Sequence, residues 1–197
     1  MALHRFNGGL KLADHKAEST QRPLLTLGIP RYLYVPLSQH IGASAEPLVQ
    51  PGDTIWKGQR IGEAQDYVAA HVHAPTSGTV VDVADYPVPH PSGLNAPCIK
   101  IAADGQDRWG PGRLHPWPDW PNRHPREIRE RIREAGIVGM GGAAFPSAVK
   151  LNPRPGQRIH TLIVNGAECE PYITCDDTLM RERPDAILEG IRVISFM

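Results

Sequence analysis

The chain has 197 residues, of which 19 are glycine and 20 are proline. This share is high, but it follows neither a collagen repeat nor a long polar tract, which excludes a fibrous or wholly disordered protein. Lys and Arg number 21, as do Asp and Glu, so the balanced charge excludes the strongly basic surface typical of nucleic-acid binders. Three cysteines without a C-x-x-C pair cannot by themselves hold an iron–sulfur cluster or a zinc ion.

No stretch of the sequence predicts direct insertion into a membrane. The longest apolar run, residues 32–37, is far shorter than a bilayer span and contains Pro36. The first nine residues are too polar for a signal peptide. We therefore expect a cytosolic chain that can still attach to a membrane complex from its surface.

The first half of the chain is predicted to be rich in β-structure. Residues 1–30 are polar and predict an N-terminal arm, and residues 31–104 alternate short β-prone runs with glycine and proline turns. Residues 105–124 carry several prolines and three tryptophans, so they predict a linker that packs against another part of the protein.

The turn spacing of residues 48–80 resembles that of the biotinyl- and lipoyl-type barrel-sandwich hybrid. Members of that family attach their cofactor to a lysine on an exposed hairpin. Here the corresponding residues are Glu63-Ala64-Gln65-Asp66, and an aspartate cannot form the amide bond to biotin or lipoate. The resemblance therefore implies a scaffold barrel that carries neither group.

Two histidines fall on the same face of a predicted strand within this region. His71 and His73 are two residues apart, which could supply half of a metal site. Because no third ligand follows at a recognisable spacing, we interpret them as solvated strand histidines and expect no metal site.

The period of the sequence becomes helical after residue 124. Pro125 suits a helix start, Ile128 and Ile132 are four apart, and Gly136 stands where a C-cap belongs. A short helix is predicted from Pro146, an apolar strand over 159–164 and a last helix from about Pro184. The apolar face of the last helix runs on to Met197, so we expect residues 125–197 to be the truncated beginning of an α/β domain in a longer protein.

A glycine-rich loop between residues 136 and 146 carries the strongest chemical signal. Gly139, Gly141 and Gly142 let the backbone approach a ligand, and the loop leads into the predicted helix start at Pro146, where free N–H groups favour a phosphate. Lys150 would add a full positive charge. These glycines alone fit a simple turn between helices equally well.

An acidic turn follows the predicted strand over 159–164. Asn165, Glu168 and Glu170 can hydrogen-bond ribityl or ribose hydroxyls, and ligands bind where strands end in open α/β sheets. Taken alone, this turn would be an ordinary solvated loop.

Together the two segments resemble the FMN- and NADH-binding 51-kDa subunit of respiratory complex I. Over nearly the whole chain, the sequence is more similar to the RnfC subunit of the Rnf electron-transport complex. The shared motifs start at Phe6 (Phe-x-Gly-Gly), Val49 (Val-x-Pro-Gly-Asp), Val88 (Val-Pro-His-Pro-Ser-Gly-Leu), Gly141 (Gly-Gly-Ala-x-Phe-Pro) and Asn165 (Asn-Gly-Ala-Glu-Cys-Glu-Pro-Tyr).

The resemblance implies a subunit that passes electrons between NADH, FMN and iron–sulfur centres in an ion-translocating ferredoxin:NAD oxidoreductase complex on the cytoplasmic side of the bacterial inner membrane. Its partners would be NAD(H) and the other subunits, and two [4Fe-4S] clusters would follow downstream. FMN would contact Gly139, Gly141, Gly142, Lys150, Asn165 and Glu168, while Phe145 and Glu170 would help to seat the nicotinamide nucleotide. No side chain is expected to act as a catalytic nucleophile or base.

The sequence departs from the related motifs at two positions. Ala167 replaces an aspartate of the 51-kDa type, and Ala144 replaces a glycine common in both relatives. The proline-rich linker, the barrel without its carrier lysine and Ala144 keep open an alternative, a non-catalytic docking module with a vestigial nucleotide loop. Under either hypothesis this stretch alone is expected to be inactive, because it holds only half of the flavin pocket.

Overall fold

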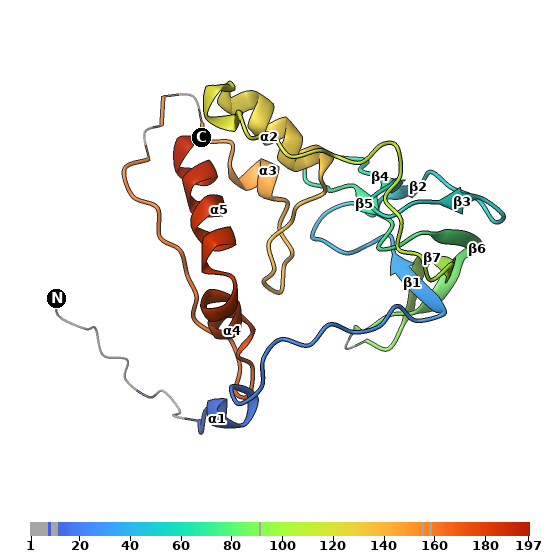
Figure 1. Ribbon diagram of the computed structural model, residues 1–197, viewed down its shortest axis with the longest axis horizontal. Helices are drawn as coiled ribbons and strands as arrows, with labels where there is room; N and C mark the ends of the chain where they lie inside the picture. Colours follow the sequence, from blue (N-terminus) through green and yellow to red (C-terminus); the bar gives the residue numbers. More distant parts are fainter. Residues whose placement is uncertain (1–7, 9–11, 91, 155, 158) are drawn as a thin grey trace. The chain divides into compact units, whose positions relative to one another are not determined.

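The computed structural model describes residues 8, 12–90, 92–154, 156–157 and 159–197 (Figure 1). The expected motif start at Phe6 and most of the first ten residues of the arm lie outside the described residues. By its internal contacts the chain divides into two units. One comprises residues 28–157 with 196–197, and the other comprises residues 1–27 with 158–195.

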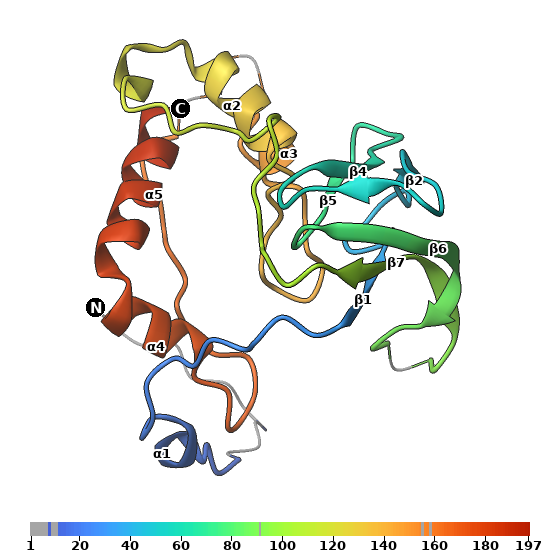
Figure 2. The same cartoon turned by 45° about the vertical axis from the view of Figure 1, so that its right-hand side comes forward.

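The larger unit contains a small barrel of two antiparallel sheets (Figures 1 and 2). The four-stranded sheet has the order β1-β7-β6-β3, and the three-stranded sheet has the order β2-β4-β5. Their bounds are β1 Tyr32–Pro36, β2 Glu46–Pro47, β3 Thr54–Ile55, β4 Arg60–Glu63, β5 Val72–His73, β6 Gly78–Pro87 and β7 Asn95–Ala103. The barrel-sandwich hybrid predicted from the turn spacing is confirmed.

Branched aliphatic side chains from both sheets fill the interior of the barrel. Ile55, Ile61, Ile99 and Ile101 are fully buried, and Val80 is almost so. Strands β6 and β7 pair over nine positions with one register shift near Asp82. These β-branched residues pack well on a pleated surface, which explains why such short strands hold together.

Glycine is required at the tight turn between β3 and β4. Gly58 has φ +73°, and a Cβ there would lie 2.4 Å from the Trp109 ring. The backbone of Lys57 also pairs with the linker, since its N–H donates to the carbonyl of Arg108. The tryptophan-bearing linker therefore packs on the barrel, as the sequence suggests.

The hairpin that would carry a cofactor in biotinyl domains is fastened to a helix here. Helix α2 spans Pro125–Glu134, and its Arg133 guanidinium donates to the carbonyls of Asp66 and Tyr67. Glu134 on the same helix pairs with Arg60 of β4. The predicted helix start at Pro125 is confirmed, with Ile128 buried and Gly136 just beyond the end.

The structure corrects the expectation that His71 and His73 are solvated. His71 is buried rather than solvated, and its Nδ1 accepts the N–H of Ala64. Burial lowers the pKa of both His71 and His73, with the nearby Arg60 guanidinium adding to the effect. Strand β5 and the preceding His71 lie against Gly136 at the end of α2 rather than at an open surface, so these rings are packing groups.

The described part of the smaller unit holds three helices and one extended stretch. Helix α1 spans Lys16–Ser19, α4 spans Cys175–Glu182 and α5 spans Pro184–Phe196. The predicted last helix from Pro184 is therefore correct, whereas α4 was not foreseen. The strand predicted over 159–164 is wrong, because none of the described residues pairs with this stretch.

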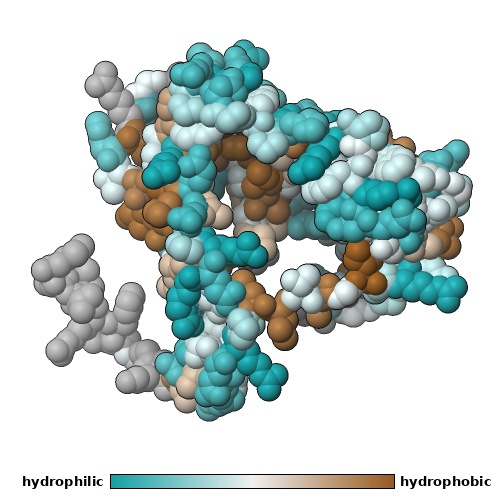
Figure 3. All heavy atoms as spheres, viewed as in Figure 1, coloured by the Kyte–Doolittle hydropathy of each residue, from teal (hydrophilic) through white to brown (hydrophobic). Residues whose placement is uncertain are grey.

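The unpaired stretch leaves several apolar side chains at the surface. Ile159, Ile163 and Val164 are more than half exposed, and so is Leu188 of α5. Figure 3 shows hydrophobic residues at the surface of the molecule. An apolar sequence predicts burial, but a strand forms only where a neighbouring strand supplies its hydrogen bonds.

Candidate functional site

The glycine-rich loop begins where α2 ends against the barrel. Gly136 has φ +65°, and a Cβ there would lie 2.5 Å from the carbonyl oxygen of His71. The loop then folds back on itself, because Gly139 N–H donates to Phe145 O and Val138 forms a bridge with Pro146. This small hairpin places the middle of the loop, residues 140–143, at its tip.

The tip glycines are not explained by the fold of the chain itself. A Cβ on Gly141 or Gly142 would meet nothing within 4 Å, and neither residue has a positive φ. None of the described residues accepts a hydrogen bond from the amides of 140–143. Open space and four successive free amides are the properties of a backbone cradle for an anionic ligand.

The next residues show how tightly the loop turns. Ala144 has φ +42°, a left-handed conformation, and its N–H donates to Gly141 O. Phe145 is half-buried beside it. Of the five site residues predicted in this region, Gly139, Gly141, Gly142 and Phe145 therefore share one compact hairpin.

The helix after the loop is shorter than a phosphate site at a helix start requires. Helix α3 spans only Ser147–Lys150, and its first amide already donates to Ile137 O. Its aligned dipoles are therefore few, and the expectation of a helix-start phosphate site at Pro146 is not supported. Lys150 is exposed at the end of α3, so its ammonium remains the one cation of the predicted set.

The acidic turn of the smaller unit is organised by Glu168. Its carboxylate accepts the N–H groups of Asp176 and Asp177 at 2.8 and 3.1 Å, which caps the start of α4. Asn165 accepts the N–H of Ala167, which closes a local turn. Two of the three predicted polar residues are thus occupied in holding their own loop.

Glu170 is placed differently from its neighbours. Its carbonyl accepts the ammonium of Lys16 at 2.8 Å, and its side chain is exposed without a hydrogen-bond partner among the described residues. The chain therefore leaves the Glu170 carboxylate available to a ligand, and the capping carboxylate of Glu168 is less so. The glycine loop and this turn belong to different units of the chain.

Glu168, Cys175 and Asp176 also bring their ligand atoms within 4.8 Å of one another. The Cys175 thiol donates to Glu168 at 3.5 Å, and its pKa is raised by burial first and by that carboxylate second. A protonated thiol hydrogen-bonded to a helix-capping carboxylate accounts for this cluster without a metal ion.

Two protein-family descriptions match successive parts of the chain. The RnfC barrel sandwich hybrid domain matches residues 4–106, which is more than half of the chain. The Nuo51 FMN-binding domain matches residues 132–197, which contain both the glycine loop and the acidic turn. The chain belongs to the RnfC family.

Curated relatives agree along almost the whole chain. The RnfC-type subunit of the ion-translocating oxidoreductase complex of Pseudomonas aeruginosa is 53% identical over 98% of this chain, and that of Rhodobacter capsulatus is 50% identical over 96%. The corresponding subunit of the proton-translocating ferredoxin:NAD(+) oxidoreductase complex of Clostridium ljungdahlii is 43% identical over 98%.

These RnfC relatives are much longer than the chain. It covers 25%, 36% and 41% of the three proteins, respectively. Among the described residues, no helix is both long and apolar enough to cross a membrane. The fold is thus an RnfC barrel followed by a segment that matches an FMN-binding domain.

Proposed function

We propose that this chain supplies the flavin-holding loop of a subunit that passes electrons between NADH, FMN and iron–sulfur centres in a membrane-attached, ion-translocating complex. The match to an FMN-binding domain supports the flavin, and the names of the relatives support the complex. Bound FMN would accept a hydride from NADH and release single electrons. NAD(H) and the other subunits of the complex are its proposed partners, on the cytoplasmic face of the membrane.

The proposal rests on the open space and the unpaired backbone amides at the tip of the glycine loop. Gly141 and Gly142 leave open space, and the amides of 140–143 have no acceptor among the described residues. These amides would hold the FMN phosphate, with Lys150 adding a charge-assisted contact. Gly139 would keep the hairpin narrow, and Phe145 would border the nicotinamide.

The acidic turn has a secondary part in this proposal. Glu170 would bond a ribose hydroxyl of the nicotinamide nucleotide, since its carboxylate is exposed. The side-chain oxygens of Asn165 and Glu168 already accept backbone N–H groups of their own loop. They would hydrogen-bond ribityl hydroxyls of FMN in addition to these contacts. Two [4Fe-4S] clusters would be supplied by a later part of the protein.

Replacing Gly141 by alanine tests the loop in the complete protein that contains this chain. The added methyl fits the fold, so the thermal unfolding midpoint should stay equal or rise slightly. It would occupy the space meant for FMN, so quenching of FMN fluorescence should show an affinity about tenfold lower. Gly112→Ala is the matched control, because its Cβ also meets nothing within 4 Å.

The substitution Lys150→Gln distinguishes binding of the FMN phosphate from binding of the flavin ring. We expect the affinity for FMN to fall about tenfold or more. Riboflavin lacks the phosphate, so its affinity should stay unchanged. Unaltered FMN affinity in both Gly141→Ala and Lys150→Gln would refute the site and favour the docking module with a vestigial loop.

A further inference from the structure

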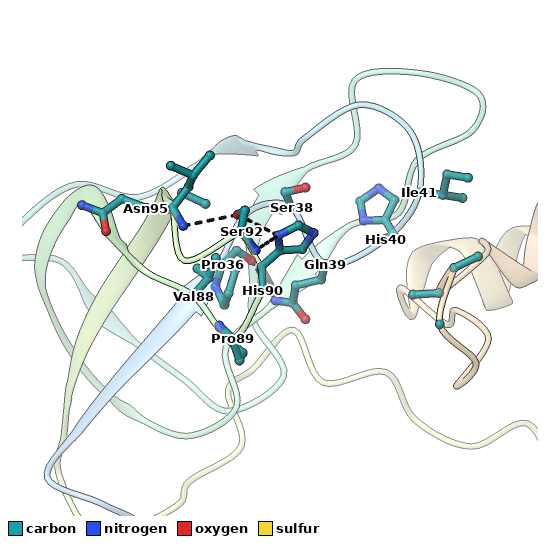
Figure 4. Close-up of a pocket in the computed structure, with 15 residues that line it drawn as sticks. Pro36, Ser38, Gln39, His40, Ile41, Val88, Pro89, His90, Ser92 and Asn95 are labelled. Atoms are coloured by element: carbon teal, nitrogen blue, oxygen red, sulfur yellow. Dashed lines mark hydrogen bonds between the residues drawn. The ribbon is translucent and has the colours of Figure 1, made fainter. Parts of the chain in front are cut away.

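A pocket of about 810 Å³ lies between the barrel and the glycine loop (Figure 4). Its walls come from three parts of the chain that are distant in sequence, within residues 36–41, 88–90 with 92–96, and 142–144. The segments are held together directly, since Ile41 N–H donates to Ala143 O at 3.0 Å. The volume is in the range of sites for cofactors and drug-sized molecules.

The lining of this pocket mixes apolar and polar groups and carries no charged side chain among its described residues. Among its described residues there is no Lys, Arg, Asp or Glu, so a phosphate or carboxylate placed inside would lack a counter-charge. The walls combine proline and aliphatic carbon with hydroxyl, amide and imidazole groups. Such walls suit a flat, uncharged ring that carries hydrogen-bonding groups.

His40 supplies a donor of fixed direction. Its Nε2 accepts the backbone N–H of Ala70 at 2.8 Å, so the proton of the neutral ring is on Nδ1. The residue is only 9% exposed, yet Nδ1 has no hydrogen-bond partner among the described residues. Solvent still reaches Nδ1, so an acceptor bound in the pocket would take the place of the water that now satisfies this donor.

His90 also lines the pocket, on the loop between β6 and β7. Its Nδ1 is bonded to the hydroxyl of Ser92, and its backbone N–H donates to Val88 O. These contacts hold the ring while Nε2 keeps no partner among the described residues. The pocket therefore offers two imidazoles whose free nitrogens are already oriented by bonds to the backbone or to a neighbouring hydroxyl.

We propose that this pocket receives the uncharged, amide-bearing ring of a flavin or nicotinamide nucleotide, and that His40 Nδ1 donates to a ring carbonyl oxygen. The inference rests on the proposed function, because the nucleotide's phosphate would be held by the adjacent glycine loop. The barrel is then a wall of the nucleotide site, with His90 as a second hydrogen-bonding group.

Two substitutions of His40 divide its roles. In His40→Gln the side-chain oxygen takes the place of Nε2, so the bond to Ala70 is kept and the donor is lost. In His40→Asn the amide nitrogen takes the place of Nδ1, so the donor is kept and the bond to Ala70 is lost. We expect weaker ring binding in His40→Gln, and a lower unfolding midpoint with near-normal binding in His40→Asn.

The measurement uses the complete protein with riboflavin, FMN and NAD⁺. Flavin binding is followed by fluorescence quenching, and NAD⁺ is titrated by calorimetry into FMN-saturated protein. His40→Gln should weaken riboflavin and FMN by the same factor, between about threefold and tenfold, if the ring is the flavin. A loss for NAD⁺ alone assigns the pocket to the nicotinamide ring.

Unchanged binding of all three ligands in His40→Gln would overturn the pocket assignment. The proposed function would survive that result if Gly141→Ala and Lys150→Gln still weakened FMN binding. If the unmodified protein bound neither FMN nor NAD⁺, the proposed function and this inference would both fail.

Discussion

Ala144 is a non-glycine residue of the glycine loop with a positive φ angle. Ala144 adopts φ +42°, where a side chain contacts its own backbone and glycine is preferred. Alanine at this position therefore lowers the stability of the hairpin, whose turn is closed by the Ala144 N–H donating to Gly141 O.

We expect Ala144→Gly to stabilise the protein by up to about 1 kcal/mol, because it removes left-handed strain. This corresponds to a rise of about 2 to 4 °C in the thermal unfolding midpoint. Ala143→Gly is the control, because Ala143 has no positive φ and its replacement only loosens the unfolded chain. Equal shifts in the two variants would contradict the assigned strain.

At the scale of elements, the junction of α2 and β5 positions the glycine loop. Gly136 fits against the His71 carbonyl and the His73 ring, both within 3 Å of where a Cβ would lie. Arg133 and Glu134 fasten the preceding turn to the barrel. The start of the loop is therefore fixed both by close packing at Gly136 and by the side-chain contacts of Arg133 and Glu134.

Gly136→Ala should separate the two elements, because the methyl meets backbone and φ is positive. We expect a loss of about 2 to 4 kcal/mol of stability, measured by urea unfolding, together with weaker FMN binding. Gly112→Ala, whose methyl meets nothing, should leave both unchanged. A stable Gly136→Ala protein with normal FMN affinity would show that the junction does not position the loop.

Local signals predicted most elements correctly, and the misses have physical causes. Alternation and turn residues indicated the barrel strands, and the Ile128–Ile132 spacing with Pro125 indicated α2. The apolar run at 159–164 predicted a strand, but strand formation depends on a partner that composition does not reveal. Helix α4 could have been found from the acidic first turn at Asp176 and Asp177.

The sequence indicated those candidate site residues that lie close together in the chain and missed those brought together only by the fold. Gly141, Gly142 and Lys150 stand out because they are close in sequence. His40 carries no local signal, since its proposed role follows from the contact with Ala70 and from a wall shared with the distant residues 88–90 and 142–144. The capping bonds of Glu168 likewise arise only once α4 has formed.

At the scale of the whole molecule, the larger unit contains three histidines whose burial makes its stability depend on pH. His40, His71 and His73 all have a pKa lowered below 6.5, chiefly by burial. In the unfolded chain each would titrate near 6.5, so the unfolded state binds more protons below that pH. Stability should therefore be constant above about pH 7.5 and fall as the pH drops below about 6.5.

The thermal unfolding midpoint measured from about pH 8 to about pH 5 checks this expectation. His73→Gln should flatten the decline, because glutamine takes up no proton in either state. His115→Gln, which changes an exposed histidine, should leave the slope as it is. A midpoint independent of pH in this range would show that the buried rings are protonated without cost.

The attachment of the hairpin at residues 63–67 to α2 limits how far this hairpin can move. In barrels that carry biotin or lipoate, this hairpin lets a tethered group travel between distant reaction centres. Here Arg133 fastens the hairpin to α2, so it is a fixed brace rather than a mobile arm. A hairpin fixed in this way cannot carry a tethered group from one site to another.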